Sequence, residues 1–164
     1  MRQSSAEHFL PSEILERASV RGGEYAWGVD DIPSVIQAAR DANLLNIGGQ
    51  LQFRLPDGET CECYWVEVDT SKSVPQKLPW QERVRLSYET ALADYQRLRS
   101  STNFLNEGKH AFPLLYEELD AEGRHPSEFI CFVWYVQKEP NKLSEIWTNI
   151  QNSWPIKFLF AAKD

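Results

Sequence analysis

An alternation of apolar and polar residues, interrupted by a turn, constrains the fold more than any other feature of this chain. Apolar and polar residues alternate over 50–55, Pro-Asp-Gly follows at 56–58, and a second extended stretch runs over 59–69. Pro-Asp suits the middle of a type I turn, and Gly58 suits the left-handed residue of the adjoining bulge. The sequence therefore predicts an antiparallel β-hairpin over 50–69.

The three-residue loop also predicts the register of this hairpin. If Leu55 pairs with Glu59, Phe53 lies opposite Cys61, and directly paired side chains share one face of a sheet. The predicted apolar face then consists of Leu51, Phe53, Cys61, Cys63 and Trp65. A slip of one residue would set Phe53 against Glu62, so the hydrophobic pattern favours the same register.

Periodicity predicts the remaining elements. Apolar residues at helical spacing predict helices over about 11–20, 32–43, 80–99 and 112–119, and a last helix that begins at Pro140. The stretch 129–136 is apolar at successive positions, which predicts a central strand covered on both faces. Shorter strands are predicted over 24–27 and 154–160, loops over 70–79 and 103–113, and a bend or strand entry at Gly48-Gly49. The sum is a single globular domain, 1–164, of α/β or α+β class, with a small, mostly antiparallel sheet flanked by helices.

The charge of the chain narrows the classes of partner. The formal net charge is −7, which repels nucleic-acid phosphates and anionic membranes. It favours a basic protein partner, or serves solubility alone. The N-terminus has no apolar run typical of a signal peptide, and the longest apolar run is too short to span a bilayer. We therefore expect a cytoplasmic protein, and the sequence leaves its oligomeric state open.

The cysteines and histidines do not form a recognisable catalytic or metal-binding motif. Cys61 and Cys63 would project from one face of a strand and could share a soft metal, but the histidines have no ligand spacing. Core packing beside Phe53 is the preferred interpretation. Cys131 could form a catalytic Cys–His pair with a histidine from a distant segment. However, it lies in an apolar run, where forming a thiolate costs free energy. We expect no catalytic residue, no metal and no cofactor.

The second strand of the hairpin supplies the candidate partner-binding residues. Carboxylates are concentrated over 57–69, a stretch that contains no Lys or Arg, and Thr60, Glu62 and Tyr64 fall on the face opposite the cysteines. An exposed sheet face with carboxylates and a tyrosine can bind a basic protein surface. The alternative is that these charges only protect an exposed sheet from aggregation. The candidate residues are Asp57, Glu59, Glu62, Tyr64, Glu67 and Asp69.

One segment also resembles known sequences. The motifs Gly22-Gly23-Glu24-Tyr25-Ala26-Trp27, Asp31-Ile32-Pro33, the run from Gly48 to Gly58 and Cys63-Tyr64-Trp65 are similar to a stretch of uncharacterised bacterial proteins. In general profile, the whole chain resembles the small acidic immunity proteins that neutralise contact-delivered bacterial toxins. That resemblance implies a non-enzymatic protein that binds and blocks a basic toxin domain, and it assigns no residue a role.

Two alternatives remain open at the level of the sequence. The first is an enzyme or small-ligand binder whose site is assembled from distant segments, with His110, His125, Tyr64 and Trp65 in a shared pocket. The second is a structural or adaptor module that self-associates through exposed aromatic residues.

Overall fold

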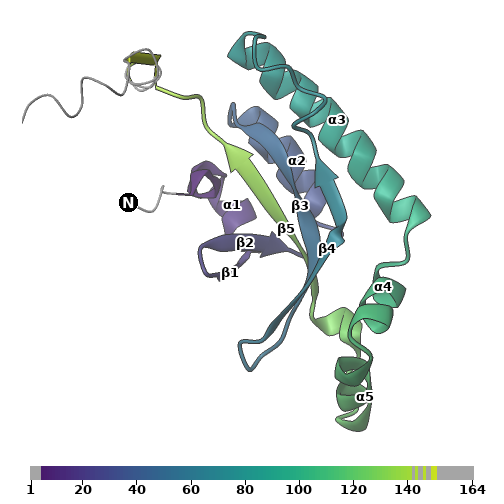
Figure 1. Cartoon of the computed structure of the whole chain (residues 1–164). Coiled ribbons are helices and arrows are strands. Elements are labelled where there is room, and N and C mark those ends of the chain that lie inside the picture. Colours follow the sequence, from purple (N-terminus) through teal and green to yellow (C-terminus); the bar gives the residue numbers. More distant parts are fainter. Residues whose placement is uncertain (1–4, 142, 144–145, 147–148, 151–164) are drawn as a thin grey trace, which may run out of the picture.

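The computed structural model describes residues 5–141 together with 143, 146, 149 and 150. Within these residues, five strands form one antiparallel sheet in the order β1-β2-β5-β3-β4 (Figure 1). The strands are β1 (Ser19–Arg21), β2 (Glu24–Trp27), β3 (Leu45–Arg54), β4 (Thr60–Asp69) and β5 (Ile130–Gln137). The apolar run at 129–136 is central, as predicted, and most of its side chains are buried. The predicted α+β class and mostly antiparallel sheet are confirmed.

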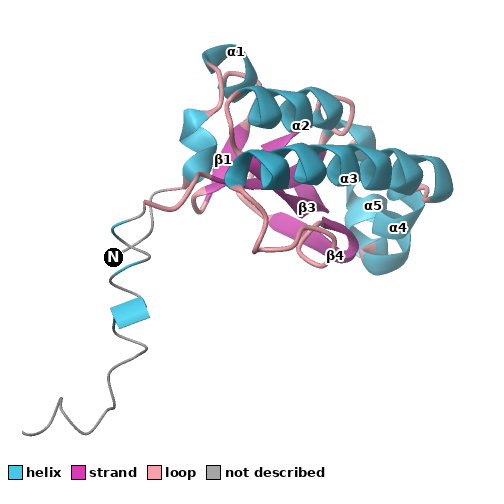
Figure 2. Ribbon diagram, turned by 90° about the horizontal axis from the view of Figure 1, so that it is seen from above, coloured by secondary structure: helices cyan, strands magenta, loops and turns pink. Residues whose placement is uncertain are grey.

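Two longer helices cover one face of this sheet. They are α2 (Ile32–Asp41) and α3 (Trp80–Ser101), and in Figure 1 α2 passes behind the strands. The view from above shows α2 and α3 on the same side of β3 and β4 (Figure 2). The shorter helical elements are η1 (Ala6–Phe9), α1 (Ser12–Leu15), α4 (Phe104–Ala111), α5 (Pro113–Ala121) and η2 (Pro126–Glu128). The opposite face of the sheet carries no helix in the described part of the chain.

The main core lies between the sheet and these two helices. Alternate residues of the strands point toward the helices, as the two-residue period requires. The strands contribute Trp27, Leu51, Phe53, Phe132 and Trp134, and the helices contribute Ile32, Val35, Ile36, Ala91 and Tyr95. Removal of this apolar surface from water is the main force that holds α2 and α3 on the sheet.

The predicted helix over 11–20 is wrong in its second half. Helix α1 ends at Leu15, and Ser19–Arg21 forms strand β1. Gly22-Gly23 is the turn between β1 and β2. Both glycines have positive φ values, 58° and 84°, which match the two-residue hairpin turns that follow the twist of paired strands.

The predicted loop over 103–113 is also wrong, because it contains helix α4. The side chain of Asn103 caps this helix by accepting a hydrogen bond from the Asn106 amide at 3.1 Å. Gly108 lies in the middle of α4, where a Cβ atom would stand 2.4 Å from Cζ of Phe53. This glycine is therefore needed for close packing of α4 against β3.

The other predicted elements within the described residues are confirmed, with small shifts at their ends. β3 begins at Leu45, so Gly48-Gly49 lies inside a strand rather than at its entry. The predicted strand over 154–160 lies outside the described residues, and the predicted helix after Pro140 lies mostly outside them.

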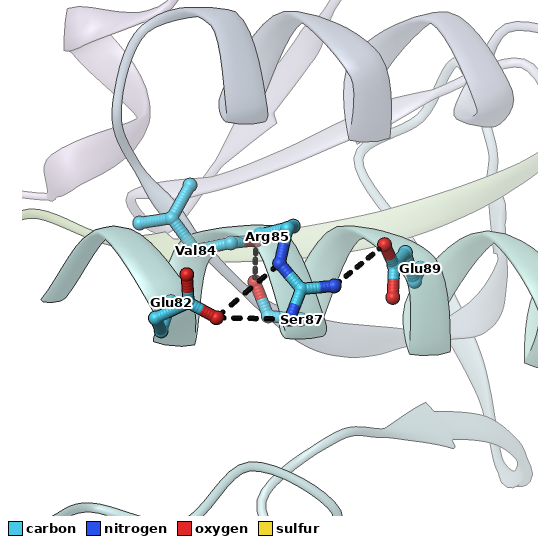
Figure 3. Close-up of polar contacts among 5 residues, drawn as sticks. All are labelled: Glu82, Val84, Arg85, Ser87 and Glu89. Atoms are coloured by element: carbon cyan, nitrogen blue, oxygen red, sulfur yellow. Dashed lines mark hydrogen bonds and ion pairs between the residues drawn. The ribbon is translucent and has the colours of Figure 1, made fainter. Parts of the chain in front are cut away.

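Helix α3 has a buried side and a side exposed to solvent, and Figure 3 shows polar contacts of residues from both. Toward the sheet, the buried Ser87 hydroxyl donates to the carbonyl of Val84 at 2.9 Å and accepts the Asn46 amide at 3.0 Å. The β3–β5 register shifts beside Asn46, so the serine hydroxyl supplies an acceptor at that irregularity. Toward solvent, Arg85 forms ion pairs of 2.9 Å with Glu82 and Glu89.

The Asn46 side chain joins three elements inside the core. It is 0% exposed, and its amide nitrogen donates to the carbonyl of Ile36 in α2 at 3.1 Å. Its side-chain oxygen accepts the indole N–H of Trp134 in β5 at 2.9 Å. Thr70, just after β4, donates to the Asn46 backbone carbonyl at 2.7 Å. The buried side-chain amide is therefore bonded to both α2 and β5, and it fixes how α2 lies against the sheet.

Two arginines attach the β1–β2 hairpin to the helix-free face. The guanidinium of Arg54 on β3, 6% exposed, donates to the carbonyls of Ser19 at 2.6 Å and Glu24 at 3.2 Å. Burial lowers the pKa of Arg54. Arg21 on β1 donates to the carbonyls of Leu55 and Glu59 at 2.5 and 2.9 Å. The sheet is therefore curled, with its β1 end held against the turn between β3 and β4.

Candidate partner-binding edge

Strand β4 forms one edge of the sheet, and a bulge interrupts its pairing with β3. Leu51 pairs with Cys63, but the adjacent β3 residue, Gln50, pairs with Glu67. The residues 64–66 therefore have no partner on β3. Val66 in this bulge is buried in the core, while Tyr64 and Trp65 are 68% and 47% exposed. The bulge directs two large aromatic side chains toward solvent at an edge strand.

The predicted hairpin register is confirmed up to this bulge. Phe53 pairs with Cys61 and Leu51 with Cys63, as the loop length indicates. The placement of Trp65 on the apolar face is wrong, because the bulge breaks the two-residue period after Cys63. Val66 occupies the inward position that the alternation assigned to Trp65.

The two exposed aromatic residues are held in a fixed arrangement. Their rings are 5.3 Å apart between centroids and meet edge to face, at 83°. The indole N–H of Trp65 donates to a carboxylate oxygen of Glu107 on α4 at 3.0 Å. Because the indole is already oriented, a partner that contacts it loses less conformational entropy on binding.

All six predicted binding residues are exposed, and they extend along β4 and its turn. Glu62 pairs with Gln52, Glu67 with Gln50 and Asp69 with Gly48, which places these carboxylates on the helix-free face. The Gln52 side chain donates to Glu62 at 3.1 Å. Asp69 accepts hydrogen bonds from Ser71, which lower its pKa. Asp57 belongs to the turn, where its side chain accepts the Glu59 amide at 2.9 Å.

The fold adds a cation to one end of this edge, which the local sequence does not reveal. Arg21 reaches the turn from β1, and its guanidinium lies 3.4 Å from the Thr60 hydroxyl. The region around Asp57 and Glu59 is therefore less acidic than the stretch 57–69 alone suggests. The acidic part of the edge runs from Glu62 to Asp69, roughly 20 Å along the strand, with Glu107 of α4 beside it. We call Glu62, Tyr64, Trp65, Glu67, Asp69 and Glu107 the acidic edge.

The cysteines lie in the interior. Cys61 and Cys63 pack in the main core, as predicted, and Cys131 is buried on the helix-free face beside Val133. Burial raises the pKa of Cys63 and of Cys131 to about 11. No group of three or more metal-ligating side chains occurs among the described residues. Thiols with these pKa values are poor nucleophiles at neutral pH.

We expect the native thiols to react very slowly with Ellman's reagent at pH 8. The raised pKa means that only about one molecule in a thousand carries the Cys63 thiolate at that pH, and burial restricts access to the sulfur. Absorbance measured in guanidinium chloride should then show all three cysteines reacting. Rapid reaction of one thiol in the native protein would contradict the buried placement.

The residues of the small-ligand alternative do not form one site. A cavity of about 590 Å³ lies between α4, α5 and η2, and its lining includes Tyr116, Asp120 and His125. His110, Tyr64 and Trp65 are not part of that lining. His110 is exposed on α4, where its Nδ1 lies 2.9 Å from the carbonyl of Asn106. Burial raises the pKa of Tyr116 to about 12, and its hydroxyl donates to a backbone carbonyl.

No protein-family model, curated protein or solved structure matches this chain. None of the helices in the described part of the chain is long and apolar enough to cross a membrane.

Proposed function

We propose that this chain is a non-enzymatic binding protein that recognises a basic protein partner, as an immunity protein neutralises a toxin domain. One observation carries this proposal. The bulge in β4 exposes Tyr64 and Trp65 at a sheet edge, between Glu62 and Glu67 along the strand and with Glu107 bonded to the Trp65 indole. Aromatic side chains surrounded by charged groups are typical of protein interfaces.

The electrostatics of the chain agree with such a partner. A net charge of −7 accelerates encounter with a cationic surface, and carboxylates at the rim fix the orientation of the complex. Val66 anchors the bulge in the core, and Glu107 orients the indole through a hydrogen bond. A partner therefore meets a surface that is already organised for contact.

The experiment is capture of the partner followed by a neutralisation assay. The purified full chain is used to capture proteins from a lysate of its source organism, and the column is washed with increasing salt. A captured basic polypeptide is then expressed in a bacterial host with and without this chain. Growth arrest that this chain relieves supports the proposal, and a captured polypeptide whose toxicity is unchanged contradicts it.

We expect the combined variant Glu62→Gln, Glu67→Gln and Asp69→Asn to weaken partner binding about tenfold at low salt. The salt dependence of the affinity should flatten, because fewer charges remain to be screened. Titration calorimetry at two ionic strengths measures both effects.

A matched control removes the same charges elsewhere. Glu13→Gln, Glu16→Gln and Glu118→Gln alter exposed positions outside both the acidic edge and the lining of the cavity between α4, α5 and η2, and should leave the affinity unchanged. An acidic-edge variant with full affinity at low salt would rule out this edge as the binding surface.

A second candidate function rests on the cavity between α4, α5 and η2. Its volume of about 590 Å³ falls within the range of small-molecule sites, and Lys109, Arg124 and Glu117 add charged groups to its lining. Thermal-shift screening of a metabolite collection tests it. Stabilisation that is lost in His125→Ala and kept in Trp65→Ala would favour this candidate over the acidic edge.

A further inference from the structure

Six tryptophans occur in the chain, and Trp65 and Trp80 show how its described part treats an indole that is not fully buried. Trp80, at the start of α3, donates its indole N–H to the carbonyl of Asn43 at 3.0 Å. The guanidinium of Arg83 lies over the Trp80 ring, 5.2 Å from its centroid. Trp80 thus combines an occupied N–H with a cation on the ring face.

Trp65 has the occupied indole N–H but lacks, among the described residues, the cation over the ring. Its N–H is occupied by Glu107 at 3.0 Å, so the polar atom of the ring needs no further partner. In the described part of the chain, cations lie over the rings of Tyr88, Trp80, Phe104, Phe129 and Phe9, and none lies over Tyr64 or Trp65. The aromatic surface of this pair is therefore exposed without an internal cation.

The surroundings of the pair favour a cation as well. Glu107 accepts from the indole through one of its oxygens, and Glu62 and Glu67 precede and follow the pair along β4, with their side chains on the helix-free face. A planar guanidinium can stack on an aromatic ring and donate to a neighbouring carboxylate at the same time. An ammonium is a more strongly hydrated point charge and lacks the planar surface for stacking.

We propose that the Tyr64–Trp65 pair is the contact point for an arginine side chain of the basic partner. This inference rests on the proposed function and makes it more specific, because it names the residue type that the partner inserts. The acidic edge would then be selective for arginine-bearing surfaces, rather than responsive to positive charge in general.

The test uses the full chain and a short oligo-arginine peptide, with an oligo-lysine peptide of the same length for comparison. Indole N–H signals are followed by ¹H–¹⁵N NMR during titration, and Trp65→Phe assigns the relevant signal. We expect a saturable shift of the Trp65 indole and binding about fivefold tighter for oligo-arginine than for oligo-lysine. Equal affinity for the two peptides would overturn the inference.

Variants locate the binding. Trp65→Ala should weaken oligo-arginine binding about fivefold, the effect expected for loss of one partly exposed cation–π contact. Leu114→Ala, at an exposed apolar position of α5, is the control and should bind as the parent chain does. The indole signals of buried Trp27 and Trp134 report whether each variant is folded. Unchanged oligo-arginine affinity in a folded Trp65→Ala variant would also overturn the inference.

This inference and the proposed function can fail separately. If Trp65→Ala leaves the affinity for the captured partner intact while the carboxylate variant weakens it, the arginine contact is wrong and the proposed function stands. If oligo-arginine binds at Trp65 but the chain relieves no toxicity, the proposed function is wrong and the arginine site stands.

Discussion

Gly49→Ala is expected to lower the free energy of unfolding by at least about 4 kcal/mol. A Cβ atom at this position would lie 1.6 Å from the backbone carbonyl oxygen of Val133 on β5. A backbone atom cannot move aside as the end of a flexible side chain can, so the β3–β5 pairing itself must separate. These two strands form the centre of the sheet, and chemical denaturation followed by circular dichroism measures the loss.

Gly28→Ala is the matched control for this substitution. The nearest atom to a Cβ at Gly28 is a side-chain oxygen of Asp31, at 3.4 Å, which is an ordinary contact. We expect its stability to stay within about 1 kcal/mol of the parent chain. A Gly49→Ala protein as stable as the Gly28→Ala protein would show that β3 and β5 do not approach as closely as described.

Asn46→Ala is expected to cost about 3 kcal/mol of stability. The substitution removes the acceptor for the buried Trp134 indole N–H and leaves a cavity among α2, β3 and β5. The hydrogen bonds of the Asn46 backbone to Ser87 and Thr70 do not depend on its side chain. The measured loss therefore reports the side-chain bonds and the packing together.

Asn106→Ala provides the comparison for Asn46→Ala. Asn106 is exposed on α4, and its backbone rather than its side chain makes the described hydrogen bonds. Its replacement should change the free energy of unfolding by less than about 0.5 kcal/mol. If urea denaturation gave the same midpoint for both variants, the Asn46 side chain would not have the stabilising role assigned to it.

The hairpin over 50–69 could be predicted because its signals are local. A Pro-Asp-Gly turn sets the loop length, and the alternation around Phe53 and Cys61 sets the face, so the register follows from adjacent residues. The bulge after Cys63 depends instead on which residue reaches the core. Trp65 and Val66 are both apolar, but the fold buries Val66, while Trp65 is exposed and bonds to Glu107, 42 positions further along the chain.

The errors elsewhere have the same origin. Gly108 lies within the predicted loop over 103–113, yet it is a helical residue whose missing side chain makes room for Phe53, 55 positions earlier. Ser19–Arg21 lacks a strong strand pattern and becomes β1 through pairing with β2 and the contacts of Arg21 with the turn. The same contacts place a cation beside carboxylates that are separated from it in sequence. Nearest-neighbour patterns do not contain this long-range information.

The close strand approach at Gly48-Gly49 also has a consequence for evolutionary relationships. Substituted Cβ atoms would lie 1.9 Å from the Val68 carbonyl oxygen and 1.6 Å from the Val133 carbonyl oxygen. A distant homologue that keeps this sheet can therefore exchange most surface residues, but it must retain two adjacent glycines before the hairpin turn. The Gly-Gly pair, its distance to the Pro-Asp-Gly turn and the later apolar strand form a sequence signature that should persist after overall similarity has disappeared.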